Sequence, residues 1–249
     1  MKNFGLVAGM LLGVSTGVFA APVSPCGTAS LASFIALGAT GCSVGDLQFS
    51  GFAALASPAG STALAPSAIT VSPLATLMPG LLFTLNASSS SVAIFDANIG
   101  FNVTPVMGAT NLINDSTLTQ NGGMATGIGI GGGSVTGVEM ICVGAAFVPT
   151  GCPVGTLASR NLGTFAVEGL TQTTDNLVFG PTSLAGIVGD FSVGGGGRGT
   201  ASVTSFGINI SEVAGRSPAI PEPATFLLTG CALLGLGFGR RWYSQRARS

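Results

Sequence analysis

The sequence predicts an all-β fold, a β-sandwich or jelly-roll-like domain with one apolar helix at each end of the chain. Three observations support this: runs that alternate between apolar and polar residues, clusters of Gly, Pro and Asn between them, and an apolar segment at each terminus. Gly accounts for 40 of the 249 residues. About ten strands between residues 21 and 215 are typical of a sandwich or jelly roll.

The predicted strands share period-two alternation or an apolar, β-branched composition. They are residues 45–52, 81–85, 93–101, 111–120, 125–130, 135–143, 163–167, 176–179, 186–193 and 201–210. A short helix is expected in the first loop, with Leu31, Phe34 and Ile35 on one face.

Two glycine-rich segments are expected to be turns. Residues 127–132 fit the pattern G-x-G-x-x-G, but another turn and strand follow where a dinucleotide site needs the start of a helix. Gly194–Gly197, followed by Arg198, is expected to be a hairpin loop.

The composition excludes several kinds of chemistry. The chain contains no His, which removes Ser-His-Asp triads, Cys-His nucleophiles and His-ligated metals. Its only Lys is Lys2, so it can form neither a P-loop nor an internal Schiff base. We expect no cofactor, no metal site and no catalytic residues. Calcium binding at Asn114-Asp115 and its neighbours stays an alternative, although no D-x-D-x-D-G loop occurs.

Charge and aromatic content also limit the partners. Residues 21–215 contain two Arg and eight Asp or Glu, a net charge of 2 − 8 = −6, which disfavours nucleic acid. The eight carboxylates are scattered, and sequence alone cannot show whether two of them face each other as in a glycosidase. Trp242 and Tyr243 lie near the C-terminus, so only Phe supplies aromatic rings to the central domain.

Four cysteines lie in the central region: Cys26, Cys42, Cys142 and Cys152. Three disulfide pairings are possible. We predict Cys26–Cys42 and Cys142–Cys152, because each pair closes a short local loop worth about 3 kcal/mol. Four thiols on one metal ion are disfavoured because no C-x-x-C spacing occurs.

Residues 1–20 have the three parts of a secretory signal peptide. Lys2 supplies the positive charge, and residues 4–14 form the apolar stretch. Cleavage is expected after Ala20 rather than Ala21, because Pro22 would adjoin the second bond.

The other end combines a proline-rich linker, residues 216–223, with an apolar segment, residues 224–239, and a basic tail, residues 240–249. At ~1.5 Å per residue the apolar segment forms roughly 24 Å of helix, slightly short for a ~30 Å hydrocarbon core. Positive charge after it keeps the tail in the cytoplasm and the central domain outside. The stop-transfer residues are Arg240, Arg241, Arg246 and Arg248.

The order Pro221-Glu222-Pro223, short apolar span and Arg cluster resembles the PEP-CTERM sorting signal, also described as the ice-binding protein C-terminal domain. The resemblance covers about the last 30 residues. It implies a Gram-negative cell-envelope protein whose C-terminal signal is processed by an exosortase, a membrane enzyme, and an association with exopolysaccharide and biofilm matrix. Residues 30–38 and 41–52 are similar to the opening of many such ectodomains, for which no catalytic residues are assigned.

The sequence therefore predicts an exported, non-catalytic surface or matrix protein, anchored by residues 224–239 before processing at the Pro221-Glu222-Pro223 motif. Two alternatives stay open. A secreted carbohydrate- or ice-binding module would have a concave or flat face rich in Thr and Asn. A glycan hydrolase would have two carboxylates converging in a pocket.

Overall fold

The computed structural model describes residues 23–75, 78–90, 92–106, 109–127, 131–153, 159–167 and 170–215. The predicted signal peptide and its cleavage residues Ala20 and Ala21 lie outside these ranges, as do the linker with its Pro221-Glu222-Pro223 motif, the apolar segment 224–239 and the arginine tail. Within the described ranges, no helix has the length and apolarity needed to span a bilayer.

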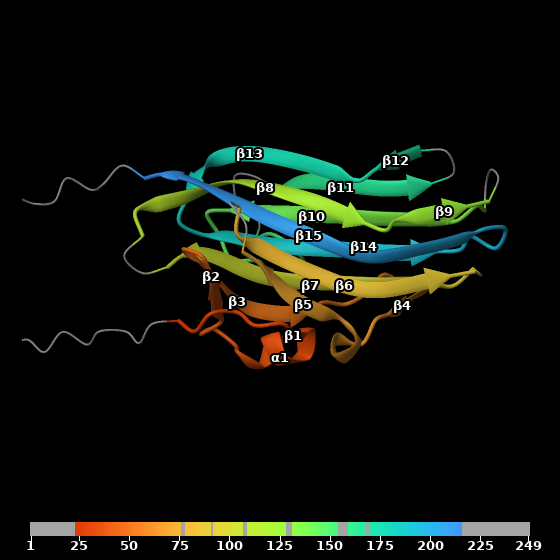
Figure 1. Cartoon of the computed structure of the whole chain (residues 1–249), viewed down its shortest axis with the longest axis horizontal. Coiled ribbons are helices and arrows are strands. Elements are labelled where there is room, and N and C mark those ends of the chain that lie inside the picture. The colour runs from red at the N-terminus through yellow and green to blue at the C-terminus, as the bar shows by residue number, and fades with distance from the viewer. Residues whose placement is uncertain are drawn as a thin grey trace, which may run out of the picture.

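The described chain folds into two packed β-sheets, which confirms the predicted all-β sandwich (Figure 1). We call the seven-stranded sheet the front sheet. Its strands, in spatial order, are β1 (Ala29–Ser30), β5 (Thr70–Leu74), β6 (Gly80–Ser89), β15 (Thr200–Ala214), β8 (Asn111–Asn121) and β13 (Thr174–Thr182), with β9 (Met124–Thr126) paired to β15.

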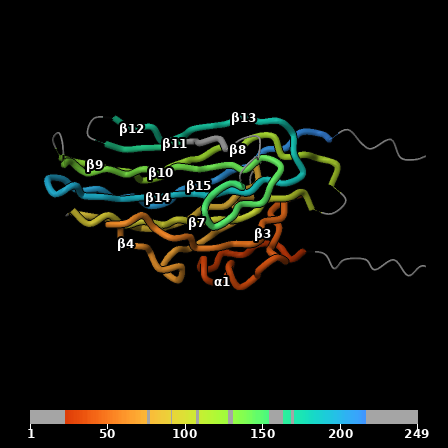
Figure 2. Tube along the Cα trace, turned by 180° about the vertical axis from the view of Figure 1, so that it is seen from behind, coloured from red at the N-terminus to blue at the C-terminus, as the bar shows by residue number. Residues whose placement is uncertain are grey.

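The eight-stranded sheet is the back sheet, seen in Figure 2. Its strands, in spatial order, are β12 (Leu170–Gln172), β11 (Ser159–Val167), β10 (Ser134–Val143), β14 (Ala185–Gly194), β7 (Ile94–Pro105), β3 (Leu47–Ala54) and β2 (Cys42–Val44). A short strand, β4 (Ser61–Ala63), pairs with β7 in parallel, whereas the other described pairings are antiparallel.

All ten predicted strands have a counterpart, although residues 128–130 of the 125–130 prediction lie outside the described part. The prediction missed β1, β2, β4, β5 and β12, which have two to five residues each and form by pairing with longer neighbours. The hairpin predicted at Gly194–Gly197 is wrong. Strand β14 belongs to the back sheet and β15 to the front sheet, so this loop crosses from one sheet to the other.

Inward-facing side chains of both sheets form one core, because side chains alternate between the two faces of a strand. Phenylalanine rings dominate its centre. Phe191 of the back sheet stacks on Phe206 of the front sheet with 4.4 Å between ring centroids. Phe83 contacts both Phe101 and Phe191, so the aromatic cluster continues from one sheet to the other.

The predicted helix is present as α1 (Leu31–Ala36). The hydroxyl of Ser30 accepts a hydrogen bond from the backbone N–H of Ser33, which caps the helix N-terminus. Leu31 and Phe34 are buried, and Ile35 is partly buried against the same core. A 3₁₀ turn, η1 (Pro66–Ala68), leads into β5 and packs near α1.

Both predicted disulfides are present. Cys26 pairs with Cys42 across 4.9 Å between Cα atoms, and Cys142 pairs with Cys152 across 5.3 Å. The first disulfide ties the segment before α1 to β2, and the second ties the turn after β10 to the end of that strand. Each crosslink is local, so neither determines how the two sheets pair.

Candidate functional site

The outward face of the front sheet is lined by short polar side chains, and we call it the polar face. On β5, β6 and β8 these residues alternate with buried residues, which places them on the outer side of the sheet, and strand pairing brings the residues of β13 and β15 beside them. Ser205 is only 4% exposed. They are Thr70, Ser72, Thr84, Thr117, Thr119, Asn121, Thr174, Asn176, Ser205 and Asn209.

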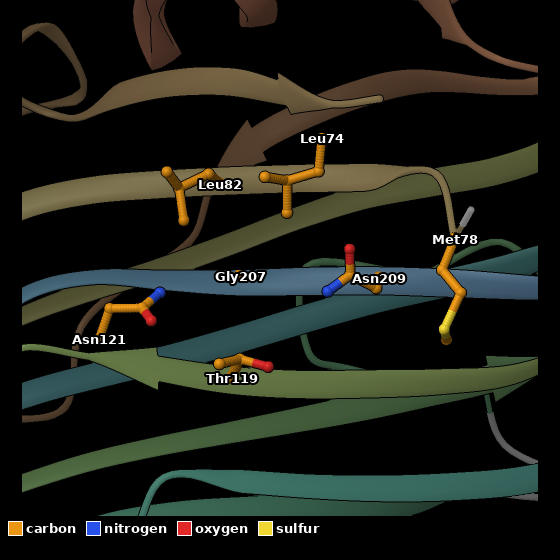
Figure 3. A pocket seen from close by; sticks show the side chains of 7 residues that line it. All are labelled: Leu74, Met78, Leu82, Thr119, Asn121, Gly207 and Asn209. Carbon is orange, nitrogen blue, oxygen red and sulfur yellow. The ribbon is translucent and has the colours of Figure 1, made fainter. Parts of the chain in front are cut away.

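A depression of about 430 Å³ lies in the middle of the polar face (Figure 3). Leu74 and Leu82 stand on one side of β15, and Thr119 and Asn121 stand on the other side. Its remaining lining residues are Met78, Gly207 and Asn209. The depression therefore has an apolar wall, a wall of hydroxyl and amide groups, and the size of a small-ligand site.

Gly207 creates this depression. It pairs with Leu82 on one neighbouring strand and with Thr119 on the other, so the missing side chain leaves a gap between them. A Cβ atom at this position would lie 3.5 Å from Leu74 Cδ1 and 3.7 Å from Leu82 Cδ1, which is ordinary van der Waals contact. Glycine is thus not required for folding here, and the space that it leaves is open to a ligand.

Hydrogen bonds organise the polar groups around the depression. The amide of Asn121 donates to the Ser205 hydroxyl at 3.4 Å. The amide of Asn176 donates to the Thr117 hydroxyl at 2.8 Å and to Asp115 Oδ2 at 3.1 Å. These bonds orient the amides along the sheet surface. None of the seven lining residues is ionisable, so the depression suits a neutral ligand that can exchange hydrogen bonds.

Two carboxyl groups converge in a second depression, of about 210 Å³, on the outward face of the back sheet. Asp96 of β7 and Asp190 of β14 both line it, and Asp190 lies two positions before Ser192, the residue that pairs with Asp96 on the neighbouring strand. Burial, and then the contact with Asp96, raise the pKa of Asp190 to about 6. The glycosidase alternative requires two carboxyls at least ~5 Å apart with a sugar between them. Asp96 is only 2% exposed, which does not match a catalytic carboxylate that must contact a sugar in the depression.

A third carboxyl group lies inside the sandwich. Glu139 of β10 is fully buried and accepts a 2.6 Å hydrogen bond at Oε1 from the Ser116 hydroxyl. The pKa of Glu139 is raised to about 8, chiefly by burial; the Ser116 hydrogen bond lowers it, and the nearby Asp115 and Asp175 carboxylates raise it. Glu139 has no route to a substrate, because it points between the two sheets.

Another pair of carboxyl groups, Asp46 and Glu212, lies at one end of the sandwich. Burial, and then contact with Asp46, raise the pKa of Glu212 to about 7. The amide of Asn111 donates to Asp46 Oδ2 at 3.1 Å. This group connects the turn between β2 and β3 with β8 and β15.

The predicted site residues divide into two groups. The disulfide cysteines are in place, whereas the signal cleavage residues, the sorting motif and the stop-transfer arginines lie outside the described residues. Within the described residues, no group of three or more acidic or Cys side chains could hold a metal ion. A face rich in Thr and Asn was predicted only for the binding-module alternative, and the alternation of Thr117, Thr119 and Asn121 along one strand is the sequence signal for it.

Comparison with known proteins gives a limited result. No protein-family model and no curated protein matches the chain. A solved carbohydrate-binding module in complex with β-1,4-galactotriose is 10% identical, with a TM-score of 0.27 over 52% of this chain and 69% of that chain.

Two enzymes are similarly distant. The enzymatically active domain of tailspike protein 4 of bacteriophage CBA120 is 12% identical, with a TM-score of 0.23 over 68% of this chain and 19% of that chain. Endoglucanase 3 of Trichoderma harzianum, from family GH12, is 12% identical, with a TM-score of 0.24 over 67% of this chain and 98% of that chain. Likeness at this level identifies neither a ligand nor an activity for this chain.

Proposed function

We propose that this protein is an exported, non-catalytic component of the cell surface or extracellular matrix, and that its polar face binds a neutral polysaccharide. The observation that carries the binding proposal is the depression at Gly207, where an apolar wall faces a wall of hydroxyl and amide groups. A pyranose ring offers matching surfaces, since apolar C–H groups cover its faces and polar hydroxyls surround its edge.

The chemistry of the depression also indicates the strength and type of binding. Without Trp or Tyr, the described domain lacks the stacking surfaces that give small sugars much of their affinity. We expect a millimolar dissociation constant for an oligosaccharide, about −4 kcal/mol, and tighter binding only through many contacts along a polymer. The depression disfavours the ice-binding alternative, which requires a flat array of Thr.

Export and sorting form the second part of the proposal. The N-terminal signal directs the chain across the inner membrane of a Gram-negative cell, and residues 224–239 anchor it until an exosortase acts near Pro221-Glu222-Pro223. Two disulfides in the domain support an extracytoplasmic location, since such bonds persist in oxidising compartments. The described chain begins at the same end of the sandwich where β15 finishes (Figure 1).

Affinity electrophoresis of the exported protein through gels containing dextran, a β-glucan or the host's exopolysaccharide tests the binding proposal. We expect retardation in at least one neutral polymer. The substitution Gly207→Val should abolish it, because the new side chain fills the depression. Gly180→Val is the matched control, since a Cβ there meets nothing within 4 Å and Gly180 lies outside the depression. Equal retardation of both variants would refute the assigned site.

The sorting proposal has its own test, which does not depend on binding. The intact mass and cellular fraction of the protein are compared with and without substitution of Pro221-Glu222-Pro223 by alanines. We expect the wild type to end near residue 221 and to leave the inner membrane, while the variant stays there. If both retain residues 224–249 in the membrane, the tail is a simple anchor and the exosortase assignment fails.

A further inference from the structure

The depression on the back sheet has a chemistry unlike that of the polar face. Its walls come from β7, β14, β10 and the segment before β4. Five of its nine lining residues carry side-chain oxygen atoms, namely Ser61, Asp96, Thr136, Asp190 and Ser192, and none is basic. These oxygens are gathered by strand pairing from four separate segments of the chain.

Strand register explains why the oxygens lie together. Asp96 pairs directly with Ser192, and Ser192 pairs on its other side with Thr136. The hydroxyls of Thr136 and Ser192 are hydrogen-bonded at 2.6 Å. Asp190 lies two residues before Ser192 on the same strand, and therefore on the same face.

The two carboxyl groups lack a neutralising partner among the described residues that line the depression. Asp96 is 2% exposed, and its Oδ2 atom is buried without a hydrogen bond from any described group. Both carboxyl groups line the same depression, where two negative charges close together repel each other.

We propose that this depression binds one calcium ion through the carboxylates of Asp96 and Asp190, with the hydroxyl oxygens of Ser192 and Ser61 in the same wall as further ligands. A bound cation offsets the repulsion between the two carboxylates. It also coordinates Oδ2 of Asp96, which has no hydrogen-bond partner among the described groups. Calcium fits better than magnesium or zinc, because it accepts oxygen ligands in irregular geometry, whereas magnesium demands a near-ideal octahedron and zinc prefers sulfur or nitrogen.

The composition of the site predicts weak affinity. Only two carboxylates contribute charge, as in the extracellular modules that bind calcium at dissociation constants on the order of 10⁻⁴–10⁻³ M. The bound ion would hold the segment containing Pro58 and Ser61 against β7 and β14. This segment is otherwise joined to the sheet by main-chain bonds such as Leu55 N–H to the Asn98 carbonyl, at 2.7 Å, and by the short strand β4.

Equilibrium dialysis with ⁴⁵Ca²⁺ and thermal unfolding of the exported protein test the proposal, after treatment with EDTA and dialysis. We expect one bound calcium ion per chain. At pH 8, addition of 10 mM CaCl₂ should raise Tm by roughly 3–10 °C. The same concentration of MgCl₂ should raise it far less, and NaCl at equal ionic strength should not raise it.

Two variants assign the site. Asp190→Asn should abolish the rise in Tm that calcium causes. At pH 8 in EDTA this variant should have a higher Tm than the wild type, because it removes one of two facing charges while preserving the shape of the side chain. Glu212→Gln alters the other carboxyl pair and should leave the calcium shift unchanged. Absence of bound calcium in the wild type, an equal response to magnesium or NaCl, or a calcium shift that persists in Asp190→Asn would each overturn the proposal. The wild-type dialysis result stands even if a variant fails to fold.

Discussion

The Ser116 hydroxyl donates a 2.6 Å hydrogen bond to Glu139 Oε1 across the interior of the sandwich, joining β8 of the front sheet to β10 of the back sheet. Both side chains are fully buried. The second oxygen of Glu139, Oε2, has no hydrogen-bond partner among the described groups. This pair therefore places an ionisable group where its charged form is strongly disfavoured.

Glu139 should make the protein more stable in acid than in alkali. Its pKa is raised from 4.5 to about 8, so the folded state binds more protons than the unfolded state between these values. The stabilisation is fully present below pH 4.5 and is lost as the pH rises toward 8. The raised pKa values of Asp190 and Glu212 add smaller effects of the same sign. Urea unfolding from pH 5 to pH 9 should show this decline.

The variant Glu139→Gln isolates the contribution of this side chain. An amide cannot ionise, so the variant should lose less stability than the wild type between pH 5 and pH 9. At pH 9 its Tm should exceed that of the wild type by several degrees. If Glu139→Gln loses as much stability between pH 5 and pH 9 as the wild type, groups other than Glu139 cause the pH dependence.

Removal of the Ser116 hydroxyl should destabilise the protein. The variant Ser116→Ala leaves buried Glu139 without its donor, at a cost of about 1–3 kcal/mol, which lowers Tm by roughly 3–10 °C. The loss should be larger at pH 9 than at pH 5, because the hydroxyl stabilises the charged form. Ser88→Ala, at an exposed position on β6, is the control and should change Tm little. Equal losses for the two variants would contradict the role assigned to the bond.

Filling the depression on the polar face should not weaken the fold. In Gly207→Val the new Cβ atom would meet Leu74 and Leu82 at ordinary contact distances, the γ-methyl groups would extend into the depression, and valine favours extended backbone. The free energy of unfolding should stay unchanged or rise by up to about 1 kcal/mol. Urea unfolding measures this change. A marked loss would mean that the binding experiment with this variant reports misfolding, and Leu82→Ala would then replace it.

The disulfide between Cys142 and Cys152 should contribute about 2–4 kcal/mol. The two cysteines are ten positions apart, and Cys142 is fully buried at the end of β10. The double variant Cys142→Ala/Cys152→Ala should unfold at lower urea concentration than the wild type. Retention of wild-type stability would show that the loop is already constrained by the bridge between Val148 and Gly151.

The contacts of the acidic side chains could not be predicted from the sequence. Asp96 and Asp190 lie far apart in the chain and become neighbours only because β7 pairs with β14. Glu139 occupies an inward position of β10 between Gly137 and Ile141, so its alternation indicated a buried carboxyl group. The identity of its partner, Ser116, depends on how the two sheets pack and has no local signal.

The sequence by itself determined the β class, most long strands, helix α1 and both disulfides. These features follow from local rules: side chains alternate along a strand, Ser30 caps a helix, and nearby cysteines close short loops. Only the tertiary structure decided strand order, the sheet crossing after β14, the depression at Gly207 and the placement of Asp96 and Asp190 in one depression. Strand neighbours and register depend on how one shared core packs around Phe101, Phe191 and Phe206, and that energy comes from contacts between distant segments.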